Sequence, residues 1–231
     1  MADIETLQTK IQKRFGSEID KTILANNELT IEVSKDNLLS VAKALRDEPD
    51  FDFKMLIDVC GVDYLHYGVS EWQSESATGT GFERGVLTDP AEIQNENTPF
   101  AKAAYSGARF ASVCHLLSIT QNHRIRLRTF VTENDLILPS LTELWPAANW
   151  FERESFDLFG IMYEGHPDLR RILTDYGFVG HPFRKDFPLI GKVEARYDAK
   201  QRRVVYEKVS IEPRILEPKV IRTDPRYKVG E

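Results

Sequence analysis

The beginning of the chain alternates between helix-type and strand-type hydrophobic spacing. Apolar residues recur every three or four positions over residues 4–15, as on one face of a helix, and Gly16 ends the pattern. Residues 19–33 carry two short β-type runs separated by Asn26-Asn27, a pair that tolerates turn conformations. This pattern predicts a helix followed by a strand hairpin.

A second helix and another strand follow this hairpin. Asp36 stands where it can cap a helix. The apolar stripe of that helix comprises Leu38, Leu39, Ala42 and Leu45. Residues 53–60 alternate as in a strand, and the strongly apolar face consists of Phe53, Met55, Ile57 and Val59. We expect both apolar faces to contribute to the hydrophobic core.

Residues 67–106 interrupt this regular pattern. They are rich in Gly, Ser, Thr, Glu and Asn and show little periodicity. Such a segment buries too little apolar surface to offset about 1–2 kcal/mol of backbone ordering entropy per residue. We interpret it as a long insertion in the domain, either functional or disordered.

Strand patterns resume after the insertion. Two β-rich runs, 110–119 and 125–131, flank Gln121-Asn122-His123 and predict a second hairpin. One face of the later strand carries a row of arginines: Arg124, Arg126 and Arg128. This row is either a solvated face of the sheet or a docking surface for an acidic partner.

The last third of the chain contains a charged helix and then little regular pattern. We predict a short helical stretch at 139–146 and a longer helix from about Asn149 to Gly160. Residues 161–231 hold several prolines and one convincing β run, 203–211. Because this segment has no useful amphipathic helix, it cannot enclose a core alone, and we expect it to lie on another protein.

The order of these elements predicts an α+β fold. Helices would pack on one face of a mainly antiparallel sheet in a core domain that covers residues 1–160 and includes the insertion at 67–106. An extended C-terminal arm that binds a partner would cover residues 161–231.

Composition and charge exclude several classes of function. The formal net charge is −6, so the chain has no global attraction to nucleic acid or to anionic lipid. The apolar runs fall short of the roughly 20 residues that cross a bilayer, and the acidic N-terminus does not resemble a signal peptide. Cys60 and Cys114 lie in strand-like runs, so we interpret them as small buried residues in a reducing cytoplasm rather than as ligands or a disulfide. Without clustered cysteines, this chain is not expected to ligate iron–sulfur clusters.

The charged helix offers the simplest catalytic hypothesis. Glu152 and Glu154 are two positions apart, about 200° around a helix, and cannot share a substrate, whereas Glu154 and Asp157 share a face. A free-standing acid/base enzyme would use that second pair with His166. The alternatives are stabilisation of the helix dipole, about 0.3–1 kcal/mol for each acid, or salt bridges to another subunit.

Gly-His-Pro occurs twice, at 165–167 and 180–182, which raises the possibility of a metal site. No cysteine pair or H-E-x-x-H spacing supplies further ligands, and no P-loop or G-x-G-x-x-G stretch is present. We therefore predict no metal, flavin or nicotinamide site in this chain.

The same region resembles the signature of a known family. Residues 152–161 read Glu-Arg-Glu-Ser-Phe-Asp-Leu-Phe-Gly-Ile, residues 165–173 read Gly-His-Pro-Asp-Leu-Arg-Arg-Ile-Leu, and residues 180–188 read Gly-His-Pro-Phe-Arg-Lys-Asp-Phe-Pro. These segments, with 115–118 and 124–127 upstream, resemble the 30-kilodalton, or C-type, subunit of proton-translocating NADH:quinone oxidoreductase (respiratory complex I). The resemblance covers about residues 1–65 and 105–215.

The resemblance implies a non-catalytic structural subunit of the peripheral arm, on the cytoplasmic face of the bacterial inner membrane. FMN, iron–sulfur clusters and quinone would be bound by other subunits, and this chain would bind none of them. Its implied partners are the 49-kilodalton, or D-type, subunit and the B-type subunit, and it would contact the membrane only through the complex. The implied interface residues are Glu152, Arg153, Glu154, Asp157, His166, Arg170, Arg171, His181, Arg184 and Lys185.

Two further interpretations remain open at this point. An equivalent subunit of a membrane-bound hydrogenase would have a similar fold and similar segments. A simple adaptor unrelated to respiration would also lack an active site.

Overall fold

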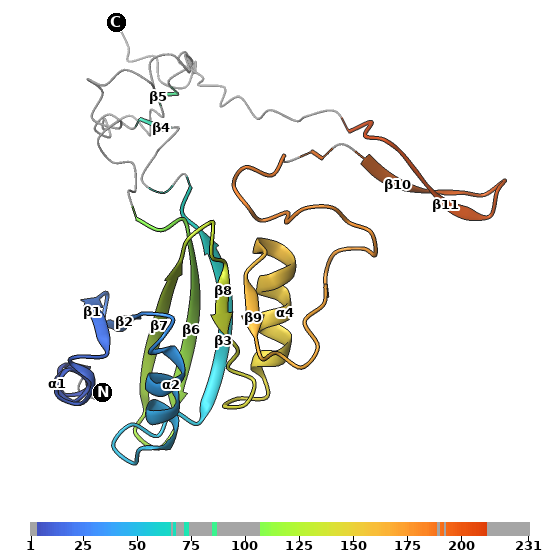
Figure 1. The fold of residues 1–231 in the computed structure, drawn as a ribbon. Coiled ribbons are helices and arrows are strands. Elements are labelled where there is room, and N and C mark those ends of the chain that lie inside the picture. Colours follow the sequence, from blue (N-terminus) through green and yellow to red (C-terminus); the bar gives the residue numbers. More distant parts are fainter. Residues whose placement is uncertain are drawn as a thin grey trace, which may run out of the picture. The chain divides into compact units, whose positions relative to one another are not determined.

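The computed structural model describes residues 4–65, 67, 72–73, 85–86, 107–188, 190–191 and 193–211 (Figure 1). The chain forms two compact units, the first from residues 1–67 and 105–187 and the second from residues 68–104 and 188–231. The domain boundary that we predicted at residue 160 lies inside the first unit. Apart from residues 67, 72–73 and 85–86, the predicted insertion lies outside the described residues; β4 (Trp72–Gln73) pairs with β5 (Gly85–Val86).

The first unit is built on a five-stranded sheet with the order β1-β2-β7-β6-β3. Its strands are β1 (Ile19–Ala25), β2 (Glu28–Val33), β3 (Met55–Asp63), β6 (Phe110–Ser118) and β7 (His123–Val131). Neighbouring strands are antiparallel except β2 and β7, which are parallel. The mainly antiparallel sheet of the predicted α+β fold is thus confirmed.

Both predicted hairpins are present, and asparagines form their turns. Asn26 and Asn27 have φ angles of 52° and 61°, the left-handed pair that a type I′ turn requires. Asn122, between β6 and β7, has φ 51°. Asparagine adopts this conformation more readily than other residues with side chains, which is why the turns could be predicted.

The helices in the described part of the chain are α1 (Ile4–Phe15), α2 (Leu38–Asp47) and α4 (Ala148–Phe159). The core joins the apolar stripes of α1 and α2 to one face of the sheet, including Val59 of β3. Gly61 points to the same side of β3 as Val59, and its Cα lies beneath α4, where an added Cβ would be 2.6 Å from Phe159 and 2.9 Å from Ser155. The three helices therefore pack against the same face.

Two predictions about α2 are wrong. The residue that precedes the helix is Asn37, with helical backbone angles and no side-chain capping bond, so Asp36 is not the cap. Leu39 is 42% exposed, and Val41 is buried instead. Because α2 begins at Leu38, position 39 points about 100° away from the buried stripe.

The apolar face predicted for residues 53–60 is correct at Phe53 and Val59, which are buried, and wrong at Met55 and Ile57. Met55 and Ile57 are 46% and 39% exposed, while Leu56 and Val59 are buried. A β-bulge between Leu56 and Asp58 shifts the alternation by one residue. Hydrophobic spacing alone does not reveal such a bulge.

The chain on both sides of α4 departs from the prediction. The stretch 139–146 is not a helix: β8 (Ile137–Pro139) leads into turns and pairs in parallel with β9 (Met162–Glu164). Ile161 and Tyr163 are buried in the core, so the chain after α4 first packs on its own domain. The helix itself is confirmed, and Gly160 ends it with φ 82°.

The predicted arginine row faces away from the core and is largely paired within the sheet. Arg126 forms an ion pair with Glu28 at 2.5 Å, and Arg128 forms one with Glu32. Both acids lie on β2, which pairs with β7 in parallel and so brings them beside the arginines. Both cysteines are free, and burial raises the pKa of Cys60 to about 11.

The close approach of α4 to β3 predicts that Gly61→Ala destabilises the first unit by about 1–3 kcal/mol, because the added methyl overlaps Phe159 and Ser155. Urea unfolding of the purified chain measures this. Cys60→Ala, at the adjacent position on the opposite side of β3, is the control and should unfold near the wild-type midpoint. Equal stability of Gly61→Ala and wild type would contradict this packing.

Candidate functional site

Helix α4 carries three charged side chains that are almost fully buried. Glu152 and Asp157 are 0% exposed and Arg153 is 4% exposed. Burial of a charge is costly unless the charge is paired or hydrogen-bonded. The partners of these side chains therefore define what the helix is built to hold.

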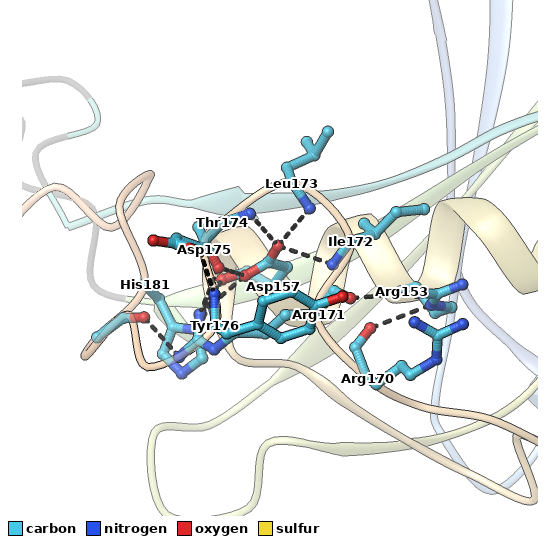
Figure 2. Close-up of polar contacts among 11 residues, drawn as sticks. Arg153, Asp157, Arg170, Arg171, Ile172, Leu173, Thr174, Asp175, Tyr176 and His181 are labelled. Carbon is cyan, nitrogen blue, oxygen red and sulfur yellow. Dashed lines mark hydrogen bonds and ion pairs between the residues drawn. The ribbon is translucent and has the colours of Figure 1, made fainter. Parts of the chain in front are cut away.

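Asp157 binds a loop that follows it in the sequence (Figure 2). Its Oδ2 accepts backbone N–H bonds from Ile172, Leu173 and Thr174 at 3.0, 2.8 and 2.8 Å. Its Oδ1 accepts the Thr174 hydroxyl at 2.5 Å and Arg171 Nη1 at 2.8 Å. Burial opposes ionisation, but these donors outweigh it and hold the pKa of Asp157 well below its usual range.

Arg153 and Arg171 add further hydrogen bonds on either side of the Asp157 contact. Arg153 donates to the carbonyls of Arg170 and Arg171, each at 3.1 Å, and its guanidinium lies over the Trp150 ring. Arg171 Nη2 donates to the Gly180 carbonyl at 2.9 Å. Together these bonds fix residues 170–180 to the exposed side of α4.

Two further side chains bind the carboxyl end of α4. His181 Nδ1 donates to the Asp157 carbonyl at 2.9 Å, and Arg184 Nε donates to the Phe159 carbonyl at 2.7 Å. The last carbonyls of a helix have no partner within the helix, so hydrogen-bond donors there are favourable, and the positive charge of Arg184 also suits the helix dipole. We call the set Arg153, Asp157, Arg171, His181 and Arg184 the α4 clamp, and residues 166–187 the clamped loop.

The far end of the clamped loop is tied to the sheet by a second buried carboxylate. Asp63 accepts the Lys185 N–H at 2.9 Å and Arg109 at 3.0 and 2.9 Å. Arg109 also pairs with Asp186 at 2.9 Å and with Glu133. Sequence reasoning missed Asp63 and Arg109, because residues far apart in the chain leave no local spacing pattern.

Glu152 is also a buried carboxylate, but it has fewer hydrogen-bond donors than Asp157. It accepts only the Ser140 hydroxyl at 2.6 Å and the Leu141 N–H at 2.7 Å, and no cation pairs with it in the described residues. Burial therefore dominates and raises its pKa to about 7. It links the turn after β8 to the second turn of α4.

The clamped loop presents large apolar side chains to solvent. Leu173 is 61% exposed, Tyr176 95%, Val179 87% and Phe183 56%. A soluble protein rarely holds several such side chains outward on a fixed loop unless they bind something.

The structure places the ten predicted site residues around this loop, but most act within the chain. Besides Glu152 and the clamp, His166 Nε2 donates to the Asn149 carbonyl at 3.1 Å. Arg170 and Lys185 have exposed side chains, while Glu154 is partly buried and makes no hydrogen bond or ion pair to the described residues. Glu154, Arg170 and Lys185 are thus the predicted residues that still face outward.

The catalytic and metal hypotheses find no support in this geometry. The Asp157 carboxylate is fully occupied by donors from the clamped loop, so it cannot act with Glu154 on a substrate. The two Gly-His-Pro histidines bind backbone groups near opposite ends of α4. Among the described residues, no group of three or more His, Cys, Asp or Glu could hold a metal ion.

Comparisons with known proteins place this arrangement in a family. Residues 31–193 match the family model of the respiratory-chain NADH dehydrogenase 30 Kd subunit. The chain is 55% identical over 231 residues to the C-type subunit of NADH-quinone oxidoreductase from Coxiella burnetii (strain Dugway 5J108-111), covering 100% of this chain and 98% of that protein. It is 54% identical over 227 residues to the same subunit from Legionella pneumophila (strain Paris), covering 98% and 96%.

A solved structure shares the fold alone. A chain of the membrane-bound sulfane sulfur reductase (MBS), an archaeal respiratory membrane complex, aligns with TM-score 0.51 and 17% identity, covering 81% of this chain and 86% of that chain.

Fold and clamp together define a scaffold-type α+β protein, in which buried charges fix a loop to a helix. The chain belongs to the family of 30-kilodalton subunits of respiratory-chain NADH dehydrogenase. It is a peripheral-arm subunit of NADH-quinone oxidoreductase, complex I, as the signature segments predicted, and the relatives favour this over a hydrogenase subunit or an unrelated adaptor. No helix in the described part of the chain is long and apolar enough to cross a membrane.

Loss of the Asp157 charge should release the clamped loop. We expect Asp157→Asn to lower the free energy of unfolding by about 3–5 kcal/mol, because Arg171 and three backbone N–H groups lose their anionic partner. Urea unfolding measures this, and limited proteolysis should show faster cleavage at 171–181.

Asp168→Asn is the matched control, since Asp168 pairs with Arg170 on the surface. Its stability and cleavage pattern should stay those of the wild type. An Asp157→Asn chain as resistant as this control would show that the clamp does not hold the loop.

Glu152 predicts a pH dependence of the opposite sign to that of Asp157. Its folded-state pKa of about 7 lies above the ordinary value of 4.5, so between these values the folded chain keeps a proton that the unfolded chain has lost. Glu152 therefore makes stability fall as pH rises from about 4.5 to about 7. Asp157, whose pKa is lowered, makes stability fall only in acid.

Glu152→Gln keeps a neutral side chain at every pH and should remove that fall, whereas Glu154→Gln should retain it. The measurement is the unfolding free energy across this pH range. Parallel profiles for Glu152→Gln and wild type would show that Glu152 does not titrate there.

Proposed function

We propose that the chain is a non-catalytic structural subunit that joins sister subunits of complex I through residues 161–231, first of all through its clamped loop. The partners would be the 49-kilodalton, or D-type, subunit and the B-type subunit. FMN, iron–sulfur clusters and quinone would be held by other subunits. The chain would lie at the cytoplasmic face of the inner membrane and contact the membrane only through the complex.

The observation that carries this proposal is the exposed apolar row on a loop held by buried charges. Leu173, Tyr176, Val179 and Phe183 are more than half exposed, and the clamp fixes the backbone beneath them. A preorganised loop loses little conformational entropy on binding, so more of its apolar burial contributes to affinity. Large apolar and aromatic side chains of this kind dominate protein interfaces.

Charged groups around this row would provide specificity. Arg170 and Lys185 are exposed, and Glu154 projects from the half-exposed side of α4. Charge pairs at the rim of an interface mainly steer association and set register. In this proposal the predicted interface residues divide into an internal group, which positions the loop, and these outer three, which face the partner.

The test replaces two apolar side chains that are more than half exposed, and because the Phe183 ring also contacts Phe159, urea unfolding of the purified variant must show that it is folded. Tyr176→Ser combined with Phe183→Ser should lower the amount of the 49-kilodalton partner recovered with the tagged chain by at least about 10-fold, since each side chain contributes about 1 kcal/mol or more at an interface. Purification from solubilised membranes followed by quantitative mass spectrometry measures it. Membrane NADH:quinone activity should fall in parallel.

Ile119→Ser is the matched control, because Ile119 is 71% exposed on the turn between β6 and β7 and lies outside the clamped loop. Its recovery of the 49-kilodalton partner should match the wild type. The proposal fails if the double variant retains full recovery, or if the purified chain alone binds a stoichiometric metal or a nucleotide by calorimetry.

A further inference from the structure

The second unit contains a hairpin whose two faces differ in chemistry. Strand β10 (Val193–Asp198) pairs with β11 (Arg203–Lys208), with Tyr197 opposite Val204. Side chains alternate between the faces of such a ribbon. One face carries Val193, Ala195, Tyr197, Val204, Tyr206 and Lys208, and the other carries Glu194, Arg196, Asp198, Arg203, Val205 and Glu207.

The polar face is organised by bonds within the hairpin. Arg196 binds Glu207 diagonally across the two strands, through two bonds of 2.5 and 3.1 Å. Asp198 Oδ1 accepts the Lys200 N–H at 2.8 Å and so stabilises the turn. Because these polar groups already bind one another, the polar face gains less from contact with another protein.

The apolar face is exposed. Val193 and Tyr197 are each 62% exposed, Val204 55% and Tyr206 66%. A two-stranded hairpin is marginally stable in water unless its apolar face packs on something. The apolar side is thus the one that gains from docking.

The charge of the hairpin indicates what kind of surface it fits. Residues 193–208 contain five Lys or Arg and three Asp or Glu, a balance of 5 − 3 = +2, in a chain whose net charge is −6. Only Arg196 among these cations forms an ion pair with a described residue. The other cations are Lys200, Arg202, Arg203 and Lys208.

We propose that the apolar face of the β10–β11 hairpin docks on a sister subunit of the complex, at an apolar patch bordered by carboxylates. This rests on the proposed function, because it places the partner in the same assembly. Tyrosine, which this face carries at positions 197 and 206, is enriched at protein interfaces. A lipid surface is a poorer fit, since this face lacks the Trp, Phe and Leu side chains that insert into a bilayer.

Site-specific cross-linking in the assembled complex tests this inference. A photoreactive phenylalanine analogue replaces Tyr197 on the apolar face or, as control, Val205 on the polar face of the same hairpin. Irradiated native membranes should give a cross-link from position 197 to a sister subunit, at least 10-fold above that from position 205. Mass spectrometry should place acidic residues beside the linked site.

Several results would overturn the inference: a cross-link to a second copy of the chain, to another part of the same chain or to lipid, or a yield at position 197 no greater than at 205. The double variant Arg202→Gln/Lys208→Gln supplies the electrostatic test, because Arg202 lies in the turn and Lys208 on the apolar face. It should reduce the cross-link from position 197 several-fold at moderate salt, because an acidic border loses its partners. An unchanged yield would exclude that border.

Failure of this inference differs from failure of the proposed function. If Tyr176→Ser/Phe183→Ser loses the 49-kilodalton partner while Tyr197→Ser/Val204→Ser retains every subunit under high salt, the hairpin does not dock and the clamped loop does. If both double variants retain every subunit, the proposed function itself fails.

Discussion

The clamped loop depends above all on one carboxylate of α4. Asp157 is fully buried and accepts five hydrogen bonds, of which three come from consecutive backbone N–H groups at 172–174. Those groups belong to a loop whose large apolar side chains are mostly exposed, so hydrophobic burial holds it only in part. The buried Asp157 carboxylate therefore holds this loop in place, as burial of an apolar stripe holds α1 and α2. The apolar side chains of the loop can then face outward.

The two buried carboxylates of α4 show how donor number decides the state of a buried acid. Asp157 has five donors, including the Arg171 guanidinium, and stays ionised. Glu152 stands more than one turn earlier, has two neutral donors, and has its pKa raised to about 7. Desolvation acts on both, so the difference lies in the partners that the surrounding chain supplies.

This arrangement also explains how a family signature can be dense in charged residues without being an active site. Arg153 of α4 donates to backbone carbonyls of the clamped loop, and Asp157 of α4 pairs with Arg171 of that loop. Removing either member of the ion pair would leave the other charge without its partner. Such residues constrain shape rather than chemistry. In the proposed function, the clamp gives the loop a fixed shape, and the side chains that it holds outward would form the surface that a neighbouring subunit binds.

The sequence by itself determined the elements whose cause is local. Three-residue and four-residue spacing placed α1, a start near Asn149 and a stop at Gly160 placed α4, paired asparagines marked a hairpin turn, and the signature segments indicated the family. Only the tertiary structure decided the bulge in β3, the parallel pairing of β2 with β7, and the partners of Asp157 and Asp63. The physical reason is range: periodicity reports contacts within one or two turns or strands, whereas a carboxylate can be satisfied by backbone N–H groups anywhere in the chain, and those donors leave no mark on the amino-acid sequence.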